Sequence, residues 1–197
     1  MYKTKTLFVG CGDGRELLSF ANDQDHLLIG LEPIDQLYAL AKARIIGKNT
    51  GDFPHIQLHH CRIQDFQAAE YAGKMDQIYF IFPTPEVLRR EARVIADRVY
   101  SLLAEETGMF RIYTEVTLSE WPDLEDRARL ACFLQTLQNE NFSFSAKEIG
   151  YHELPPMARE SNCGLKFQAH GITRFTAIEA IKETPSMGRQ PYGKADS

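Results

Sequence analysis

Three glycines at alternate positions near the start of the chain mark a place where a ligand could meet the backbone. Gly10, Gly12 and Gly14 follow the apolar run 7–9 and precede a helical pattern. Glycine allows a sharp turn and a close approach of a ligand, and the helix that follows directs its N-terminal N–H groups at that turn. The spacing therefore predicts a nucleotide-cofactor site formed by these glycines and by Cys11 between them.

A carboxylate at the end of the next apolar run could hold the sugar of such a cofactor. Glu32 follows the run 27–31, and an acid at the end of a second strand can accept hydrogen bonds from two ribose hydroxyls. The G-x-G-x-G spacing favours S-adenosylmethionine over a dinucleotide, whose usual spacing is G-x-G-x-x-G. Two other interpretations stay open: a tight turn without a ligand beside a solvated acid, and a nicotinamide cofactor that uses the same ribose contact.

The apolar pattern alternates between strands and helices, which predicts a Rossmann-like α/β fold with a mostly parallel sheet and helices on both faces. A late pair of alternating segments predicts an antiparallel strand pair that closes the sheet. Strands are expected at 5–10, 27–32, 55–61, 76–82, 108–114, 142–150 and 166–178, and helices at 14–22, 34–47, 64–72, 86–105 and 119–139. Residues 1–183 are expected to form a single domain, followed by a disordered tail over 184–197, which lacks an apolar period.

The carboxyl ends of the predicted parallel strands meet at one edge of the sheet, where ligands bind in folds of this class. Several segments should come together at that edge. They are the glycine turn, Glu32, the segment 61–65, the loop 82–85, and Thr114 with Glu115. We therefore expect Pro33, Arg62, Ile63 and Phe82 to join the glycines in holding the cofactor.

The loop Phe82-Pro83-Thr84-Pro85 follows the fourth strand and could form a wall of the site. Its two prolines stiffen it and should hold Phe82 and Thr84 in extended conformations, without a helix start. A stiff wall suits a flat substrate placed against a methyl donor, although a proline-rich strand end is the simpler explanation. Arg89, on the helix after the loop, could contact a phosphate or carboxylate, or could pair with neighbouring glutamates.

The composition narrows the class of protein. The 197 residues carry a net charge of −5 and a pI near 5.7, so the chain has no overall positive field for non-specific nucleic-acid binding. Four scattered cysteines without a CxxC pair indicate reduced thiols and a cytoplasmic location. No apolar stretch approaches the length of a membrane span, so no membrane partner is expected.

A metal site is not expected. His59 and His60 stand beside Cys61, but adjacent residues on a strand point to opposite faces and do not readily share one ion. The sequence has no second cluster with the spacing of zinc ligands.

Taken together, these residues resemble the bacterial tRNA (guanine-N7)-methyltransferases, a branch of the class I S-adenosylmethionine-dependent enzymes. The resemblance covers about residues 6–180. The matching segments are the Gly10–Gly14 turn, the strand end 28–32, the loop 82–85 against Phe-Pro-Asp-Pro, Thr114-Glu115 against Thr-Asp, Arg159 and Ser161 in a substrate loop, and 169–172 against Gly-His-Gly-Val. The resemblance implies S-adenosylmethionine as cofactor. It also implies substrate contacts from Pro83, Thr84, Pro85, Arg89, Thr114, Glu115, Arg159, Ser161 and His170, with Thr84 and Glu115 nearest the chemistry.

The chain departs from this family mainly on the substrate side. Thr84 replaces the loop aspartate, and a hydroxyl cannot act as a carboxylate base. Phe8 replaces a glutamate before the glycine turn, and Arg62 stands where an acid often contacts the adenine amino group. We therefore predict an N-methyltransferase, monomeric or homodimeric, for a guanine-like or other flat nitrogen heterocycle, including a small molecule. The alternatives are a true tRNA guanine-N7 methyltransferase and a non-catalytic cofactor-binding relative.

Overall fold

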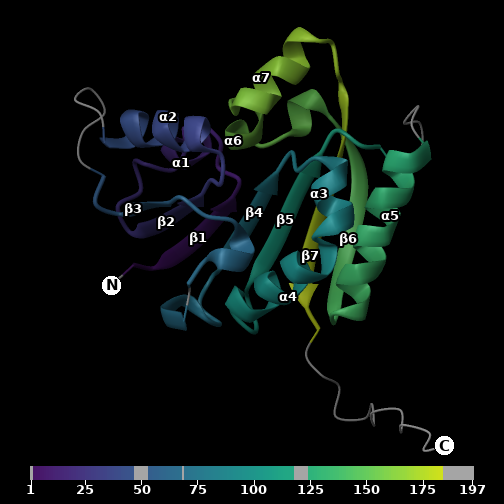
Figure 1. The fold of residues 1–197 in the computed structure, drawn as a ribbon, viewed down its shortest axis with the longest axis horizontal. Helices are drawn as coiled ribbons and strands as arrows, with labels where there is room; N and C mark the ends of the chain where they lie inside the picture. Colours follow the sequence, from purple (N-terminus) through teal and green to yellow (C-terminus); the bar gives the residue numbers. More distant parts are fainter. Residues whose placement is uncertain (1, 47–52, 68, 118–123, 184–197) are drawn as a thin grey trace, which may run out of the picture.

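One mixed sheet of seven strands organises the part of the chain described by the computed structural model, residues 2–46, 53–67, 69–117 and 124–183 (Figure 1). The strands are β1 (Thr4–Val9), β2 (His26–Leu31), β3 (Ile56–His59), β4 (Gln77–Ile81), β5 (Met109–Thr114), β6 (Phe142–Gly150) and β7 (Arg174–Lys182). They lie in the order β3-β2-β1-β4-β5-β7-β6. The first five are parallel, and β7 runs antiparallel between β5 and β6, so the predicted fold class is confirmed.

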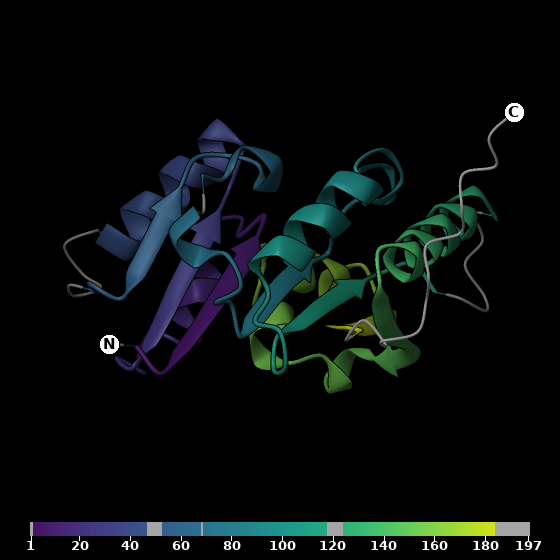
Figure 2. The ribbon, with the colours of Figure 1, turned by 90° about the horizontal axis from the view of Figure 1, so that it is seen from below.

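Helices cover both faces of this sheet. They are α1 (Arg15–Leu18), α2 (Asp35–Ile46), α3 (Pro85–Arg90), α4 (Ala92–Leu102), α5 (Leu124–Asn139), α6 (Pro156–Arg159) and α7 (Asn162–Ala169), with short 3₁₀ turns η1 (Ile63–Asp65), η2 (Ala69–Tyr71) and η3 (Tyr151–Glu153). Helices α3 and α4 lie over one side of β4 and β5 (Figure 2). Among the described helices, none has the length and apolar character needed to cross a bilayer.

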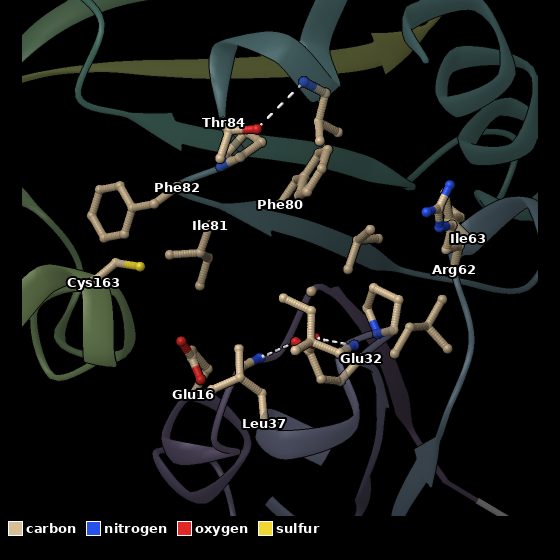
Figure 3. Close-up of a pocket in the computed structure, with 18 of the residues that line it drawn as sticks. Glu16, Glu32, Leu37, Arg62, Ile63, Phe80, Ile81, Phe82, Thr84 and Cys163 are labelled. Carbon is tan, nitrogen blue, oxygen red and sulfur yellow. Dashed lines mark hydrogen bonds between the residues drawn. The ribbon is translucent and has the colours of Figure 1, made fainter. Parts of the chain in front are cut away.

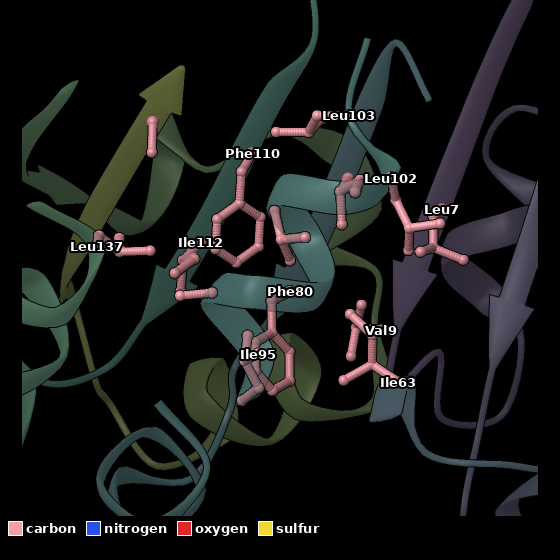
Figure 4. Close-up of a cluster of buried hydrophobic side chains, with 14 of the residues drawn as sticks. Leu7, Val9, Ile63, Phe80, Ile95, Leu102, Leu103, Phe110, Ile112 and Leu137 are labelled. Atoms are coloured by element: carbon pink, nitrogen blue, oxygen red, sulfur yellow. The ribbon is translucent and has the colours of Figure 1, made fainter. Parts of the chain in front are cut away.

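The period-two pattern of the strands divides the apolar side chains between two cores. On one face Leu7 and Phe110 pack in the same buried cluster as Ile95 of α4 and Leu137 of α5 (Figure 4). On the other face Phe8, next to Leu7 in sequence, belongs to a second cluster. That cluster also holds Leu17 of α1, Ile45 of α2, and Met157 and Ala158 of α6.

Two features of the topology create a site beyond the carboxyl ends of the parallel strands. The chain adds β2 and β3 on one side of β1 and β4 and β5 on the other, so the strand order reverses between β1 and β4. A crevice opens at such a reversal because the connections leave in opposite directions. Helices α6 and α7 lie beyond the same ends of β4 and β5 (Figure 1).

The predicted strand over 166–178 is wrong in its first part. Residues up to Ala169 form α7, and β7 begins only at Arg174 and continues to Lys182. The helix is favoured by its caps: the Ser161 hydroxyl accepts a hydrogen bond from the Gly164 N–H (2.9 Å), and Gly171 takes φ +71° after its end. The alternating apolar residues near Phe167 therefore lie on one helix and not on a strand.

Three predicted helices are also shorter than expected. The helix at 14–22 ends at Leu18, and the segment 64–72 forms two separate 3₁₀ turns. The expected long helix 86–105 is divided at Glu91, whose φ of −111° is not helical, and it ends at Leu102. The expected start of the helix 119–139 and the expected disordered tail lie outside the described residues.

The packing of α7 on α6 gives a direct test of this fold. A Cβ at Gly164 would lie 2.1 Å from the Ala158 carbonyl oxygen and 2.6 Å from that of Arg159. Gly164→Ala should therefore lower the free energy of unfolding by about 1–3 kcal/mol, measured by urea denaturation. The matched control is Gly150→Ala, because Gly150 has an extended backbone and a Cβ there meets nothing closer than 3.4 Å. Equal effects of the two substitutions would contradict the close α6–α7 contact.

Candidate active site

A cavity of about 310 Å³ lies where the strand order reverses (Figure 3). Its volume is at the lower end of the range for small-molecule sites. The residues that line it come from the ends of β1, β2 and β4, from α1, α2 and η1, from the start of α3 and α4, and from the start of α7. They are Val9, Gly10, Gly12, Glu16, Leu31, Glu32, Pro33, Ile34, Leu37, Cys61, Arg62, Ile63, Gln64, Phe80, Ile81, Phe82, Pro83, Thr84, Val87, Glu91, Ile95, Ser161, Asn162 and Cys163.

The glycine turn and Glu32 form one connected unit in the floor of this cavity. Gly10, Gly12 and Gly14 have φ values of +70°, +56° and +81°, in the left-handed region that favours glycine. The Gly12 N–H donates to Glu32 Oε2 at 2.8 Å, and the Ile34 N–H donates to Glu32 Oε1 at 2.8 Å. The carboxylate therefore joins the turn after β1 to the loop after β2.

The Glu32 carboxylate is buried and still has acceptor capacity. The residue is 2% exposed, and burial raises the pKa of its carboxyl, an effect that the Ile34 and Gly12 N–H groups oppose. Each carboxylate oxygen has two lone-pair directions, and one N–H occupies only one of them. A pair of adjacent hydroxyl groups placed in the cavity could occupy the others.

Two of the residues predicted to bind the cofactor, Gly14 and Cys11, do not line the cavity. A Cβ at Gly14 would lie 3.1 Å from Ala41 Cβ, so this glycine lets the end of the turn pack against α2. Cys11 is 1% exposed and lies beneath Gly30, where an added Cβ would be 2.8 Å from its sulfur. Both residues support the turn on the side away from the cavity. The glycine spacing alone could not distinguish this supporting role from direct contact with a ligand.

One end of the cavity is an apolar slot with a polar entrance. Ile34 and Ile63 contribute its apolar walls. Arg62 lies at the entrance and donates to Glu91 at 3.5 Å, and the Gln64 side-chain amide also donates to Glu91, at 3.3 Å. A flat apolar ring with polar edges fits such a slot.

The loop after β4 forms the wall opposite the glycine turn, with a conformation that differs from the prediction. Phe82 has φ +51° and is not extended. Its ring packs against Phe167 (centroids 4.9 Å apart) and Phe175 (5.6 Å), which holds the residue in this unfavourable region. Such backbone strain is concentrated at functional sites.

Thr84 lines the cavity, and its backbone is extended as predicted (φ −64°, ψ 146°). Helix α3 starts directly after it at Pro85, one residue before the expected helix start at 86. Thr84 is the N-cap of α3, and its hydroxyl accepts a hydrogen bond from the Val87 N–H at 3.4 Å. Pro85 fills the first turn of that helix and, unlike Pro83, does not line the cavity.

Most of the other predicted substrate residues lie away from the cavity. Thr114 is fully buried and accepts from the Val116 N–H, while burial raises the pKa of the neighbouring Glu115 carboxyl. Arg89 is exposed and pairs with Glu86 at 3.0 Å. Arg159, on α6, and His170 do not line the cavity either. His170 is exposed after the end of α7 and is not in a strand. Of the more distant predicted residues only Ser161 lines the cavity.

Glu16 is a site residue that the sequence prediction missed. It is 6% exposed, lines the cavity, and has no hydrogen-bond partner for Oε2 among the described residues. Burial, together with the charges of Asp13 and Glu32, raises the pKa of its carboxyl to about 8. The one signal in the sequence was an acid directly before the apolar pair Leu17-Leu18.

Among the described residues, no group of three or more His, Cys, Asp and Glu side chains is arranged to hold a metal ion. His60 instead pairs with Asp35 at 3.0 Å and stacks on Tyr38. His59 contacts the edge of the Phe66 ring, and the two histidines thus have separate surroundings.

Comparison with known proteins identifies the fold. No protein-family model matches the chain, and no curated protein sequence matches it significantly. Among solved structures it is similar to an antibiotic-related methyltransferase, with 21% identity, a TM-score of 0.69, and coverage of 92% of this chain and 89% of the other. The described chain thus has a methyltransferase fold over most of its length.

Two further structures share this fold. One is the W203A mutant of the 16S rRNA (adenine(1408)-N(1))-methyltransferase from Catenulisporales acidiphilia, solved with its cosubstrate S-adenosylmethionine. It is 17% identical, with a TM-score of 0.69 and coverage of 97% and 89% of the two chains. The other is the aminoglycoside resistance methyltransferase NpmB1, 18% identical, with a TM-score of 0.64 and coverage of 91% and 88%.

The buried Glu16 predicts a pH dependence of stability. Its pKa is about 8 in the folded chain and near 4.5 when exposed, so the folded state holds the extra proton between these values. This contribution to stability is present below pH 4.5 and is lost as the pH rises towards 8. Glu16→Gln should remove this pH-dependent contribution. The free energy of unfolding of the variant, relative to that of the original chain, should therefore increase by more than about 1 kcal/mol from pH 5.5 to pH 8. Urea denaturation at both pH values measures this, and a constant difference would show that Glu16 ionises normally.

Proposed function

We propose that the chain is an S-adenosylmethionine-dependent methyltransferase that methylates a ring nitrogen of a flat heterocycle. The observation that carries the proposal is the Glu32 carboxylate, which is buried in the floor of the cavity and tied to Gly12 of the glycine turn. The methyltransferase fold and the cosubstrate of one structural neighbour support it.

The residues present fit this cofactor. Glu32 offers acceptor positions for the two hydroxyls of a ribose, and the left-handed glycine turn leaves open space where side chains would stand. A Cβ at Gly12 would point towards Glu16 Oε1, at 3.9 Å, on the cavity side of the turn. The apolar slot of Ile34 and Ile63 would hold the adenine ring. Pro33 and Arg62 would flank it.

The bound cofactor supplies a methyl group already activated on a sulfonium, so the chain must mainly orient the acceptor and exclude water. Phe82 and Pro83 form a rigid wall for a flat ring, because Phe82 is fixed by two further phenylalanines. Thr84 and Ser161 also line the cavity, although each hydroxyl already accepts a hydrogen bond from an N–H group of a helix N-terminus. These residues position the acceptor and do not act as strong bases.

A ring nitrogen is the acceptor that best fits this arrangement. Its lone pair is free at neutral pH, so methylation needs no carboxylate base where Thr84 stands. Glu115, the predicted acid on the substrate side, does not line the cavity. Both guanine N7, from the resemblance found in the sequence, and adenine N1, from the structural neighbours, are nitrogens of this type.

The charge on α3 and on the adjacent helix α5 limits how strongly an RNA could be held there. Arg89 pairs with Glu86, and Arg129 of α5 pairs with Asp126 and Glu125. These arginines add little net positive charge on this side of the chain, in agreement with the overall charge of −5. We therefore propose either a small heterocycle or an RNA base held through few phosphate contacts, whose binding depends weakly on salt.

Removal of the Glu32 carboxylate tests the cofactor site. Glu32→Ala should weaken S-adenosylmethionine binding more than tenfold, since charge-assisted hydrogen bonds contribute about 1.5–3 kcal/mol. Isothermal titration calorimetry on the folded variant, verified by circular dichroism, measures this. Asp35→Ala is the matched control, because it removes the same charge from a side chain that is 92% exposed nearby. Unchanged affinity in a folded Glu32→Ala variant would exclude Glu32 from the site.

A methyl-transfer assay tests the acceptor. The chain and labelled S-adenosylmethionine should be incubated with 16S rRNA, total tRNA and purine nucleosides, and the products analysed by mass spectrometry. The label should be found on a ring nitrogen, and transfer to RNA should change little between low and physiological salt. Tight cofactor binding without transfer to any acceptor would favour the non-catalytic alternative, and a copurified nicotinamide cofactor would favour an oxidoreductase.

A further inference from the structure

An unpartnered buried carboxyl group at the second end of the cavity is the feature that the proposed function leaves unexplained. Glu16 lies with Cys163 on one side of the cavity, whereas Arg62 and Ile63 lie on the other (Figure 3). Glu16 Oε2 is fully shielded and lacks a hydrogen-bond partner among the described residues. A buried carboxyl group without a partner is unfavourable, so a group that fills the cavity there would relieve the cost.

The direction of the cavity identifies what that group is. Glu32 lies between the two ends, at the place proposed for the ribose. The end with Ile63 is apolar and suits the adenine ring. The part of S-adenosylmethionine on the far side of the ribose is its amino-acid portion, which carries an α-ammonium and an α-carboxylate. The end with Glu16 is therefore the end that this portion would reach.

We infer that Glu16 accepts a hydrogen bond from the α-ammonium group of the cofactor and so selects ligands that carry the amino-acid portion. This inference rests on the proposed function. An ammonium donor would give the Glu16 carboxyl group, which lines the cavity, a partner from the ligand, and an ion pair in a shielded cavity is stronger than one in water. The alternative partner, the α-carboxylate, would place two acids together.

The charges around Glu16 favour a cation. Asp13 and Glu32 raise its pKa, and Arg15 acts in the opposite direction. The Asp13 carboxylate is itself paired with Arg44 at 2.6 Å and with Arg15 at 3.1 Å, which reduces its charge towards the cavity. The other titratable groups near Glu16 are Cys11, behind the turn, and Cys163, on α7. Lys166 lowers the pKa of the Cys163 thiol, and Glu115 raises it. Helix α6, which packs on α1, carries Arg159 as its single charged residue.

Proton balance follows from this contact. The Glu16 carboxyl has a pKa of about 8 in the free chain and holds a proton at pH 7. An ammonium within hydrogen-bond distance favours the ionised form, so binding should release that proton to solvent. The affinity for the cofactor should accordingly rise with pH between about 6 and 7.5, below the range in which the α-amino group of the ligand loses its own proton.

The test compares ligands with and without the amino-acid portion. Binding of S-adenosylmethionine, S-adenosylhomocysteine and 5′-methylthioadenosine is measured by calorimetry at pH 6 and pH 7.5, in buffers of different ionisation enthalpy. Glu16→Gln, which keeps the shape of the protonated carboxyl, should weaken the first two ligands about tenfold or more at pH 7.5 and change 5′-methylthioadenosine by less than about twofold. The variant should also lose the proton release.

Glu91→Gln is the matched control, because Glu91 lines the other end of the same cavity. It should leave the proton release intact. Equal weakening of all three ligands by Glu16→Gln, affinity that falls with rising pH, or unchanged affinity would each overturn the role of Glu16 while leaving the proposed function in place. Failure of the original chain to bind any of the ligands would instead refute the proposed function itself.

Discussion

The structure depends on one buried carboxylate that ties two loops together. Glu32 holds the Gly12 N–H with one oxygen and the Ile34 N–H with the other, both at 2.8 Å. These bonds fix the turn after β1 against the loop after β2, at the point where the strand order reverses. Because the N–H groups satisfy only part of the acceptor capacity of Glu32, the same contact that orders the floor also leaves it open to a ligand.

The opposite wall comes from segments far apart in the sequence. Phe82 takes an unfavourable φ of +51° and is held there by Phe167 of α7 and Phe175 of β7. Helix α7 can approach only because Gly164 has no Cβ to meet the carbonyl oxygen of Ala158. The cavity is thus bounded on one side by the first third of the chain and on the other by the loop after β4 with the start of α7. Such a rigid site can orient an acceptor.

The electrostatics of the cavity are uneven along its length. Glu91 is matched by Arg62 and Gln64 at one end, whereas Glu16 at the other end lacks a partner for Oε2 among the described residues. A cavity of this kind favours a ligand with a neutral ring at one end and a positive charge at the other. The proposed cofactor has these properties, since both its sulfonium and its ammonium lie beyond the ribose.

The sequence by itself determined the parallel sheet, the glycine turn and the place of Glu32, because local alternation and spacing encode strands and the turns between them. It did not determine the break at Glu91, the helix α7 that replaces part of a predicted strand, or the left-handed Phe82, since caps and packing from distant segments decide these. Nor could it separate Gly12, which faces the cavity, from Gly14, which packs on Ala41. Only the tertiary structure placed Glu16 in the cavity, because burial by several elements, and not spacing, gives that carboxyl its environment.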